Sequence, residues 1–281
     1  MSANHGCRTL AGAALIGALL GAPVALADDG PRAPVPMADY VRFVVAGREL
    51  SGWPLDPTAE GGCALLVEGG AIEVIADQPP PELKEHTARP VTEIPSPGLV
   101  AGLAHVDAGV RDRCEELLVD QGAVALPHLG AALDDRSAEA CRRALRILVD
   151  QAAKFPKPAH AWLSRVRANL GADDELVREM ALRAYAALGE EDVRERCEDA
   201  LFRDASIHVR HEAIVQLGRK GDLRAVDAIL KHLEECGERS LRLVSFDALR
   251  RLTGRRFGRN EEQWRNWWSN HREELLPPSG G

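Results

Sequence analysis

The sequence predicts a mainly α-helical fold, an α-solenoid formed as a right-handed superhelix of helical hairpins, with a small N-terminal β module. Two observations carry this prediction. Three similar segments, VREMALRAYAALG, VRHEAIVQLGRKG and LRLVSFDALRRLTG, begin 32 residues apart at Val177, Val209 and Leu241. Nearer the N-terminus, residues 40–45 (YVRFVV) alternate in period two and are rich in β-branched residues, which is typical of a strand.

The composition is that of a folded chain, and its charge argues against two classes of binding partner. The 281 residues are 45% hydrophobic and 28% charged, with a net charge of −8. These values are those of globular proteins and exclude a wholly disordered or collagen-like chain. Because general binding to nucleic acid or to an anionic membrane requires a basic face, the acidic balance argues against both.

Residues 1–27 have the layout of a secretory signal peptide. Arg8 precedes an uncharged run rich in Ala, Gly and Leu, and Ala25-Leu26-Ala27 forms a cleavage site of small residues. The alternative is a retained N-terminal anchor, although the apolar run is short for a permanent span. We therefore expect an exported protein, periplasmic or secreted, with no stable membrane span after cleavage.

The cysteines favour isolated thiols. Five remain after residue 27, widely spaced and without a C-x-x-C pair, which argues against a disulfide framework and a zinc ribbon.

Residues 28–97 are predicted to form the β module and a linker. Two apolar runs, residues 63–67 and 71–75, flank Glu68-Gly69-Gly70, a pattern that indicates a hairpin. With residues 40–45 they suggest a partly formed β-barrel or a curled sheet. Six prolines between residues 79 and 97 predict a stiff linker to the helices.

Residues 98–254 are predicted to form the helical repeats, in roughly nine or ten helices counted from residue 99 to the C-terminus. Each pair of helices has one apolar stripe that it cannot cover alone, so neighbouring pairs should stack. Small residues four positions after each segment start should allow close approach of the helices. Residues 145–170 depart from the pattern and suggest an irregular repeat. The expected helix N-caps are Asp107, Asp174 and Asp204, and the expected helix-end glycines are Gly122, Gly189, Gly218 and Gly254.

The rhythm D-x-x-VR-x-x-A-x-x-x-L-G resembles HEAT repeats over about residues 99–254, particularly the short bacterial type also seen in phycobilisome-lyase-like proteins. The ending LRRLTGRRFGRNEEQWRNWW resembles the close of exported HEAT-repeat proteins of planctomycete-type bacteria, in which a TG-x-x-FG turn leads into a Trp-rich helix. The resemblance implies stacked helical hairpins and names no partner.

Residues 255–281 are predicted to form a capping helix and a tail. Trp264, Trp267 and Trp268 share one helical face, and Asn260 is the expected N-cap. A solenoid must close the end of its last repeat, so we interpret the three tryptophans as a structural cap. The alternative is that an exposed tryptophan anchors a partner.

Two histidine pairings allow a metal hypothesis. His208 and His211 are three residues apart, and His232 and Cys236 are four apart, so each pair can share a helix face and both together could form a zinc site. The alternative is a solvent-exposed histidine pair and a buried thiol. His211-Glu212 resembles the dipeptides that hold iron in deoxyhypusine hydroxylase, but that enzyme needs several and this chain has one. We predict no cofactor and no catalytic residue.

The sequence thus predicts a non-enzymatic protein-interaction scaffold whose partner is another protein, with a basic patch to match the acidic chain. The expected contact residues follow the segment starts: Arg178, Arg210, His211 and Arg242. Some of these arginines could instead pair with an aspartate of a neighbouring turn as a structural ladder. The alternative functions are a metal-dependent enzyme using the His and Cys residues, and an envelope assembly or anchoring protein acting through the β module.

Overall fold

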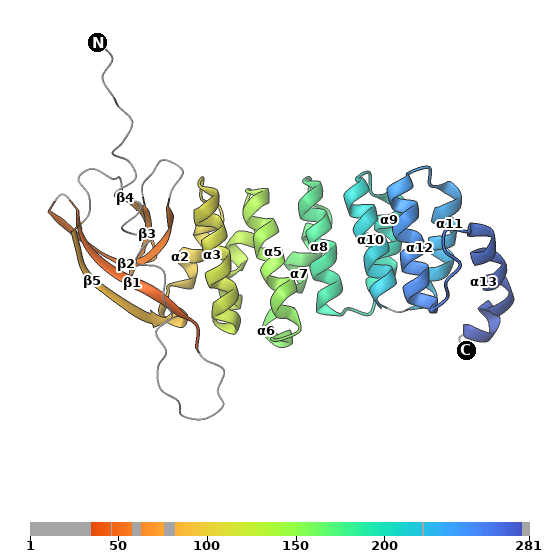
Figure 1. Cartoon of the computed structure of the whole chain (residues 1–281), viewed down its shortest axis with the longest axis horizontal. Coiled ribbons are helices and arrows are strands. Elements are labelled where there is room, and N and C mark those ends of the chain that lie inside the picture. Colours follow the sequence, from red (N-terminus) through yellow and green to blue (C-terminus); the bar gives the residue numbers. More distant parts are fainter. Residues whose placement is uncertain (1–34, 46, 58–62, 76–81, 221, 277–281) are drawn as a thin grey trace, which may run out of the picture. The chain divides into compact units, whose positions relative to one another are not determined.

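The computed structural model of the chain describes residues 35–45, 47–57, 63–75, 82–220 and 222–276 (Figure 1). The chain divides into two compact units, Met1–Ala159 and His160–Gly281. The predicted signal peptide, residues 1–27, lies outside the described residues. Among the helices that are described, none combines the length and the apolar character needed to cross a membrane.

A five-stranded antiparallel sheet opens the first unit, in the order β4-β3-β2-β1-β5. The strands are β1 (Met37–Val45), β2 (Arg48–Pro57), β3 (Cys63–Val67), β4 (Ile72–Ile75) and β5 (Glu82–Pro90). The predicted hairpin joins β3 to β4, and Gly70 takes a left-handed conformation in its turn, with φ of +82°. The sheet ends at β4 on one side and β5 on the other, so it is open and not a closed barrel.

Strand β5 occupies much of the segment predicted to be a linker. It pairs with β1 from Met37 opposite Pro90 to Val44 opposite Glu82. A proline is tolerated here because Pro90 ends an edge strand, where a missing N–H costs little. The sequence ELKEHTARP is too polar to show the hydrophobic alternation of a strand, which is why the prediction missed it. The prolines at 79–81 lie outside the described residues.

The sheet and the first helices form one packed body, so the predicted boundary at residue 97 does not separate two compact parts. A Cβ placed on Gly102 would lie 2.9 Å from Ile72 Cδ1 of β4, and it would also strike Cys114 of the next helix. The helices in this unit are α2 (Ser96–Gly102), α3 (Ala108–Gln121), α4 (Gly130–Leu133), α5 (Ala138–Ala152) and α6 (Pro156–His160), which ends at the division. Short 3-10 helices span Val91–Glu93, Gly122–Val124 and Leu126–His128.

The second unit contains the three similar segments that begin at Val177, Val209 and Leu241. Its helices are α7 (Leu163–Asn169), α8 (Glu175–Leu188), α9 (Val193–Arg203), α10 (Ile207–Lys220), α11 (Ala225–Glu235), α12 (Arg239–Thr253) and α13 (Glu261–Leu275). Helices α8, α10 and α12 begin 32 residues apart, and α10 packs against both of the others (Figure 1). The predicted small positions, Ala181, Ala213 and Ser245, are fully buried. The 32-residue spacing of the three segments therefore corresponds to one helical hairpin per repeat.

Two of the three expected aspartate N-caps are present in the structure. Asp107 accepts a hydrogen bond from the Val110 N–H, and Asp174 accepts from Leu176 and Val177. Asp204 does not cap α10; Ser206 Oγ accepts from the His208 N–H instead, at 3.2 Å. The described residues hold twelve α-helices from α2 onward, more than expected, because the irregular region around residues 122–170 is divided into short pieces.

Gly218 was expected at a helix end and lies inside α10. Gly189 and Gly254 do end α8 and α12 in left-handed conformations, with φ of +82° and +70°. At Gly218 a Cβ would lie 2.9 Å from both Cα and Cβ of Ala248 on α12. The glycine is thus required for close approach of two helices and not for its backbone freedom.

Replacing Gly218 by alanine should therefore destabilise the protein. Overpacking against a neighbouring backbone costs about 1–3 kcal/mol, which outweighs the gain of about 1 kcal/mol in helix propensity. Urea unfolding followed by circular dichroism would measure the change. Gly237→Ala is the matched control, because an added Cβ there meets nothing within 4 Å. An equal effect of both substitutions would contradict the close approach.

Within the described residues, Cys114, Cys141, Cys197 and Cys236 form no disulfide. The first three are buried, as the sequence predicts for isolated thiols. Burial, reinforced by nearby Glu212, raises the pKa of Cys197 to about 12, so this thiol is neutral and acts as a small core residue.

Candidate functional site

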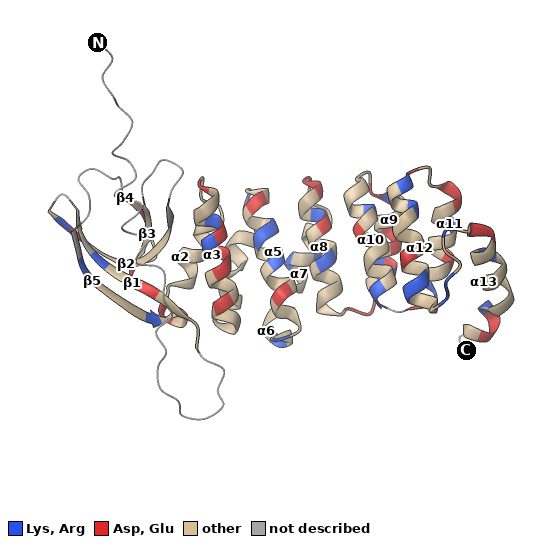
Figure 2. Cartoon of the chain, viewed as in Figure 1, with Lys and Arg blue, Asp and Glu red and all other residues tan. Residues whose placement is uncertain are grey.

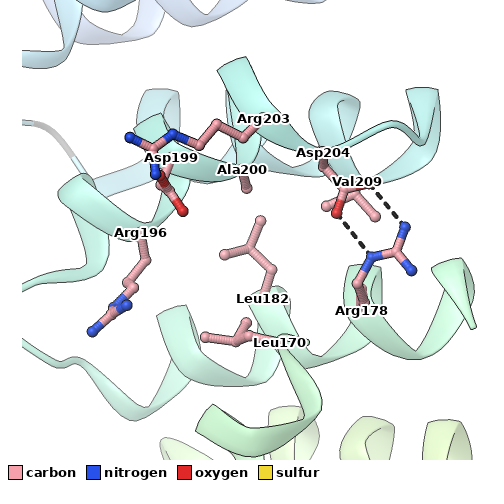
Figure 3. A pocket seen from close by; sticks show the side chains of 9 residues that line it. All are labelled: Leu170, Arg178, Leu182, Arg196, Asp199, Ala200, Arg203, Asp204 and Val209. Atoms are coloured by element: carbon pink, nitrogen blue, oxygen red, sulfur yellow. Dashed lines mark hydrogen bonds and ion pairs between the residues drawn. The ribbon is translucent and has the colours of Figure 1, made fainter. Parts of the chain in front are cut away.

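Arg178, a predicted contact residue, is used entirely inside the fold. Its Nε and Nη2 donate to the two carboxylate oxygens of Asp204 at 2.8 and 2.9 Å (Figure 3). Its Nη1 donates to the carbonyls of Ala172 and Asp173 at 2.9 Å each. A bidentate pair of this kind fixes both side chains. Arg178 therefore joins the start of α8 to the turn between α9 and α10, as in the structural-ladder alternative.

Arg242 makes the same kind of contacts two repeats further along the chain. Its Nη2 donates to Glu261 Oε2 at 2.7 Å, and its Nη1 donates to the carbonyls of Leu233 and Cys236. Arg111, which the sequence analysis did not select, donates to the carbonyls of His105 and Val106 in the first unit. In each case the arginine follows the apolar residue that begins the segment, and it donates hydrogen bonds to backbone carbonyls of the preceding turn.

Arg210 departs from this pattern. It is half-buried, and its Nε is buried without a hydrogen-bond partner among the residues that the structure describes. The acid that pairs with Arg178 stands 26 residues later, at Asp204. The same offset from Arg210 leads to Cys236, which carries no negative charge. The position equivalent to Asp204 is therefore a neutral residue in this repeat.

Restoring the acid should restore the pair. We expect Cys236→Asp to raise the free energy of unfolding by about 0.5–1 kcal/mol, the gain usual for a partly exposed ion pair. A double-mutant cycle with Arg210→Gln, measured by urea unfolding, would isolate this interaction. A gain that persists in the Arg210→Gln background would show that another contact produces it.

The Arg178–Asp204 pair also predicts a dependence of stability on pH. The Arg178 guanidinium holds the pKa of Asp204 below its usual value, and the two side chains are only 18% and 13% exposed. A lowered pKa stabilises the fold above the carboxyl's ordinary pKa, near 3.9, and this contribution is lost as pH falls through the lowered value.

Asp204→Asn should cost about 2 kcal/mol at pH 7 because it leaves a partly buried guanidinium without its anion. The difference from wild type should shrink as pH falls below about 4 and vanish once pH has passed the lowered pKa, where the folded wild-type carboxyl is neutral too. Urea unfolding at a series of pH values would test this. Asp199→Asn is the control, since Asp199 and its partner Arg203 are 56% and 81% exposed and the pair should contribute little. A difference independent of pH would contradict the assignment.

A hollow of 210 Å³ lies beside this pair (Figure 3). Apolar side chains, Leu170, Leu182, Ala200 and Val209, form part of its lining. Its charged residues pair with other residues: Arg178 with Asp204, Arg203 with Asp199, and Arg196 with Asp192. The hollow therefore offers a ligand little uncompensated charge.

A larger hollow of 590 Å³ lies at the end of the last repeat. It is lined by Leu243, Phe246, Asp247, Arg250, Arg256, Gly258, Arg259 and Trp264. Three of these are arginines, and aromatic side chains contribute apolar surface. In the sequence, the RRFGRN stretch carries a resemblance to exported HEAT-repeat proteins, and no repeat position assigns a role to its arginines. The clustering of arginine in an acidic chain could have indicated them.

The four residues of the metal hypothesis do not converge. His208 and His211 are exposed on α10, whereas His232 is buried on α11 with its Nδ1 3.3 Å from Ser245 Oγ of α12. Cys236 Sγ contacts the Glu238 carbonyl at 3.7 Å. Within the described ranges no three His, Cys, Asp or Glu side chains are grouped as metal ligands would be. The residues of each pair are close in sequence as the hypothesis requires, but His208 and His211 are exposed to solvent, whereas His232 is buried. The two pairs therefore lie in different surroundings.

The tryptophans of α13 divide into two kinds. Trp264 and Trp268 are buried, and their indole N–H groups donate to the Gly258 carbonyl at 3.0 Å and to Asp227 Oδ1 of α11 at 2.7 Å. These contacts are those of a cap on the last repeat. Trp267 is half-buried, stacks on His271 and has the Arg255 guanidinium 5.4 Å from its ring centre.

Comparison with known proteins supports the repeat architecture. A family model described as HEAT repeats matches residues 161–250, so a HEAT-repeat domain is present. No curated protein matches the chain. Two crystal structures of engineered proteins are similar at 17% identity each. The first has a TM-score of 0.40, and the aligned region covers 57% of this chain and 79% of the engineered protein. The second has a TM-score of 0.41, and the aligned region covers 66% of this chain and 92% of the engineered protein. The fold is mainly α, of HEAT type, with a small N-terminal antiparallel sheet.

Proposed function

We propose that the protein is a non-enzymatic, exported scaffold that binds another protein through the helical surface of its second unit. The observation that carries this proposal is the repetition of one helical hairpin at 32-residue spacing, with α8, α10 and α12 side by side. HEAT repeats are generally protein-interaction scaffolds, since stacked helices present an extended surface.

The internal ladder defines which residues are available to a partner. Arg178 and Arg242 are occupied by turn carbonyls and acids, so they stabilise the surface and do not contact the partner. Of the predicted contact residues, His211 is exposed on α10. His208 on the same helix and Arg239 at the start of α12 are also exposed. A partner would therefore contact the exposed positions between the ladder residues.

The experiment is to identify proteins that crosslink to the full chain in its host and then measure binding of the purified partner. His211→Glu with Arg239→Glu should weaken binding about tenfold or more. Thr87→Glu, an exposed position on β5, is the control and should leave binding unchanged. If only the Thr87 variant lost binding, the sheet would be the binding element and the anchoring alternative would replace this proposal.

Export is a separate part of the proposal. It is supported by the basic start, apolar run and small-residue cleavage site of residues 1–27. Cell fractionation and mass spectrometry of the mature N-terminus would test it, with a start at Asp28 as the expected result. A full-length chain recovered from the cytoplasm would contradict it.

A further inference from the structure

Five arginines are clustered in the sequence around the larger hollow, and three of them, Arg250, Arg256 and Arg259, line it. The end of α12 and the loop before α13 are rich in basic residues (Figure 2). They contain Arg250, Arg251, Arg255, Arg256 and Arg259, all of which are exposed. Arg250 lies 3.4 Å from Asp247. Across the described part of the chain, no acidic side chain lies within ion-pair distance of the others. We call the hollow and these five arginines the basic groove.

The groove also has an apolar wall. Helix α13 is fastened to α11, since Arg265 Nη2 donates to the Leu230 carbonyl at 2.8 Å and Arg272 pairs with Asp227 at 2.9 Å. This placement leaves Leu243 and Phe246 of α12 lining the hollow. Leu243 is half-buried, and Phe246 is buried except for 8% of its surface. A volume of 590 Å³ is enough for a few side chains of a bound segment.

We infer that the basic groove binds an acidic peptide segment of the partner protein, one that carries an aliphatic or aromatic residue among its carboxylates. This inference rests on the proposed scaffold function and specifies one of its contact sites. Arginine matches a carboxylate with two parallel hydrogen bonds, and the apolar wall would take the hydrophobic side chain. The expectation of a basic partner, drawn from net charge, is thereby reversed at this end of the chain.

The net charge of the chain favours a short acidic peptide over a nucleic acid as the ligand of the basic groove. The whole chain carries −8, so a long row of phosphates extending beyond the groove would meet repulsion. A short acidic segment interacts mainly within a screening length of about 8 Å, where the five arginines dominate. The groove is therefore suited to a local anionic segment and not to an extended polyanion.

The test uses the full chain and a fluorescein-labelled synthetic peptide with several glutamates around one leucine. Fluorescence anisotropy at low salt should show binding that weakens steeply with added salt. Arg256→Glu with Arg259→Glu should weaken it about tenfold or more. Arg136→Glu with Lys157→Glu makes the same change in net charge at exposed positions outside the groove and should change binding less than about twofold.

Each other outcome has a defined meaning. Equal weakening by both pairs of substitutions would show general electrostatic attraction and would overturn the inference, as would no binding at all. Tighter groove-dependent binding of single-stranded DNA of equal charge would assign the groove to nucleic acid instead. If a natural partner binds the wild type and the groove variant equally, the scaffold proposal stands and this inference fails. Circular dichroism of each variant excludes unfolding as the cause.

Discussion

Replacing Ala213 by arginine is expected to destabilise the second unit by about 4 kcal/mol or more, enough to remove its cooperative unfolding transition. Ala213 is fully buried on α10, which packs against both α8 and α12. An arginine there would have to displace a neighbouring helix or bury a charge without a partner. Urea unfolding followed by circular dichroism would measure the loss.

The control for this substitution is Ala187→Arg. Ala187 lies near the C-terminal end of α8 and is exposed, so the same change in side chain should alter stability by less than about 0.5 kcal/mol. The contrast tests the register of the repeat, because the two alanines differ in which side of a helix they occupy. A mild effect at Ala213 would mean that the small buried position has been assigned to the wrong residue.

The helical part of the fold could be predicted from the sequence because its packing is periodic. Ala181, Ala213 and Ser245 recur at one spacing, and each fills the same narrow contact between helices. Strand β5 has no comparable pattern, since an edge strand with exposed side chains needs no hydrophobic alternation. Its place is determined by backbone pairing with β1, which a single sequence does not display.

The roles of the arginines in the candidate site could not be predicted from the sequence alone. The repeated arginine positions are visible in the sequence, but their partners depend on where the chain returns 19 to 26 residues later, at Glu261 for Arg242 and at Asp204 for Arg178. The role of these side chains is therefore decided by tertiary structure. Arg256 and Arg259 were overlooked for the converse reason. Only the fold shows that no described acid reaches them and that a hollow lies beside them.

The second large effect is expected at Trp264. Its side chain is 1% exposed, packs edge-on against Phe257 at 4.9 Å between ring centres and donates to the Gly258 carbonyl. Trp264→Ala should reduce the free energy of unfolding by about 3–5 kcal/mol, as expected when a large buried side chain leaves a cavity. Urea unfolding would measure this loss.

Two further substitutions separate the cap from a binding role. Trp264→Phe keeps most of the volume and removes the hydrogen bond, so it should cost about 1–2 kcal/mol. Trp267→Ala should cost less than about 1.5 kcal/mol, because this ring is half-buried and rests on His271. If Trp267 proved as important for stability as Trp264, the face assigned to the cap would be wrong. If Trp267→Ala instead weakened binding of the acidic peptide while the fold was preserved, the Arg255–Trp267 pair would extend the basic groove along α13.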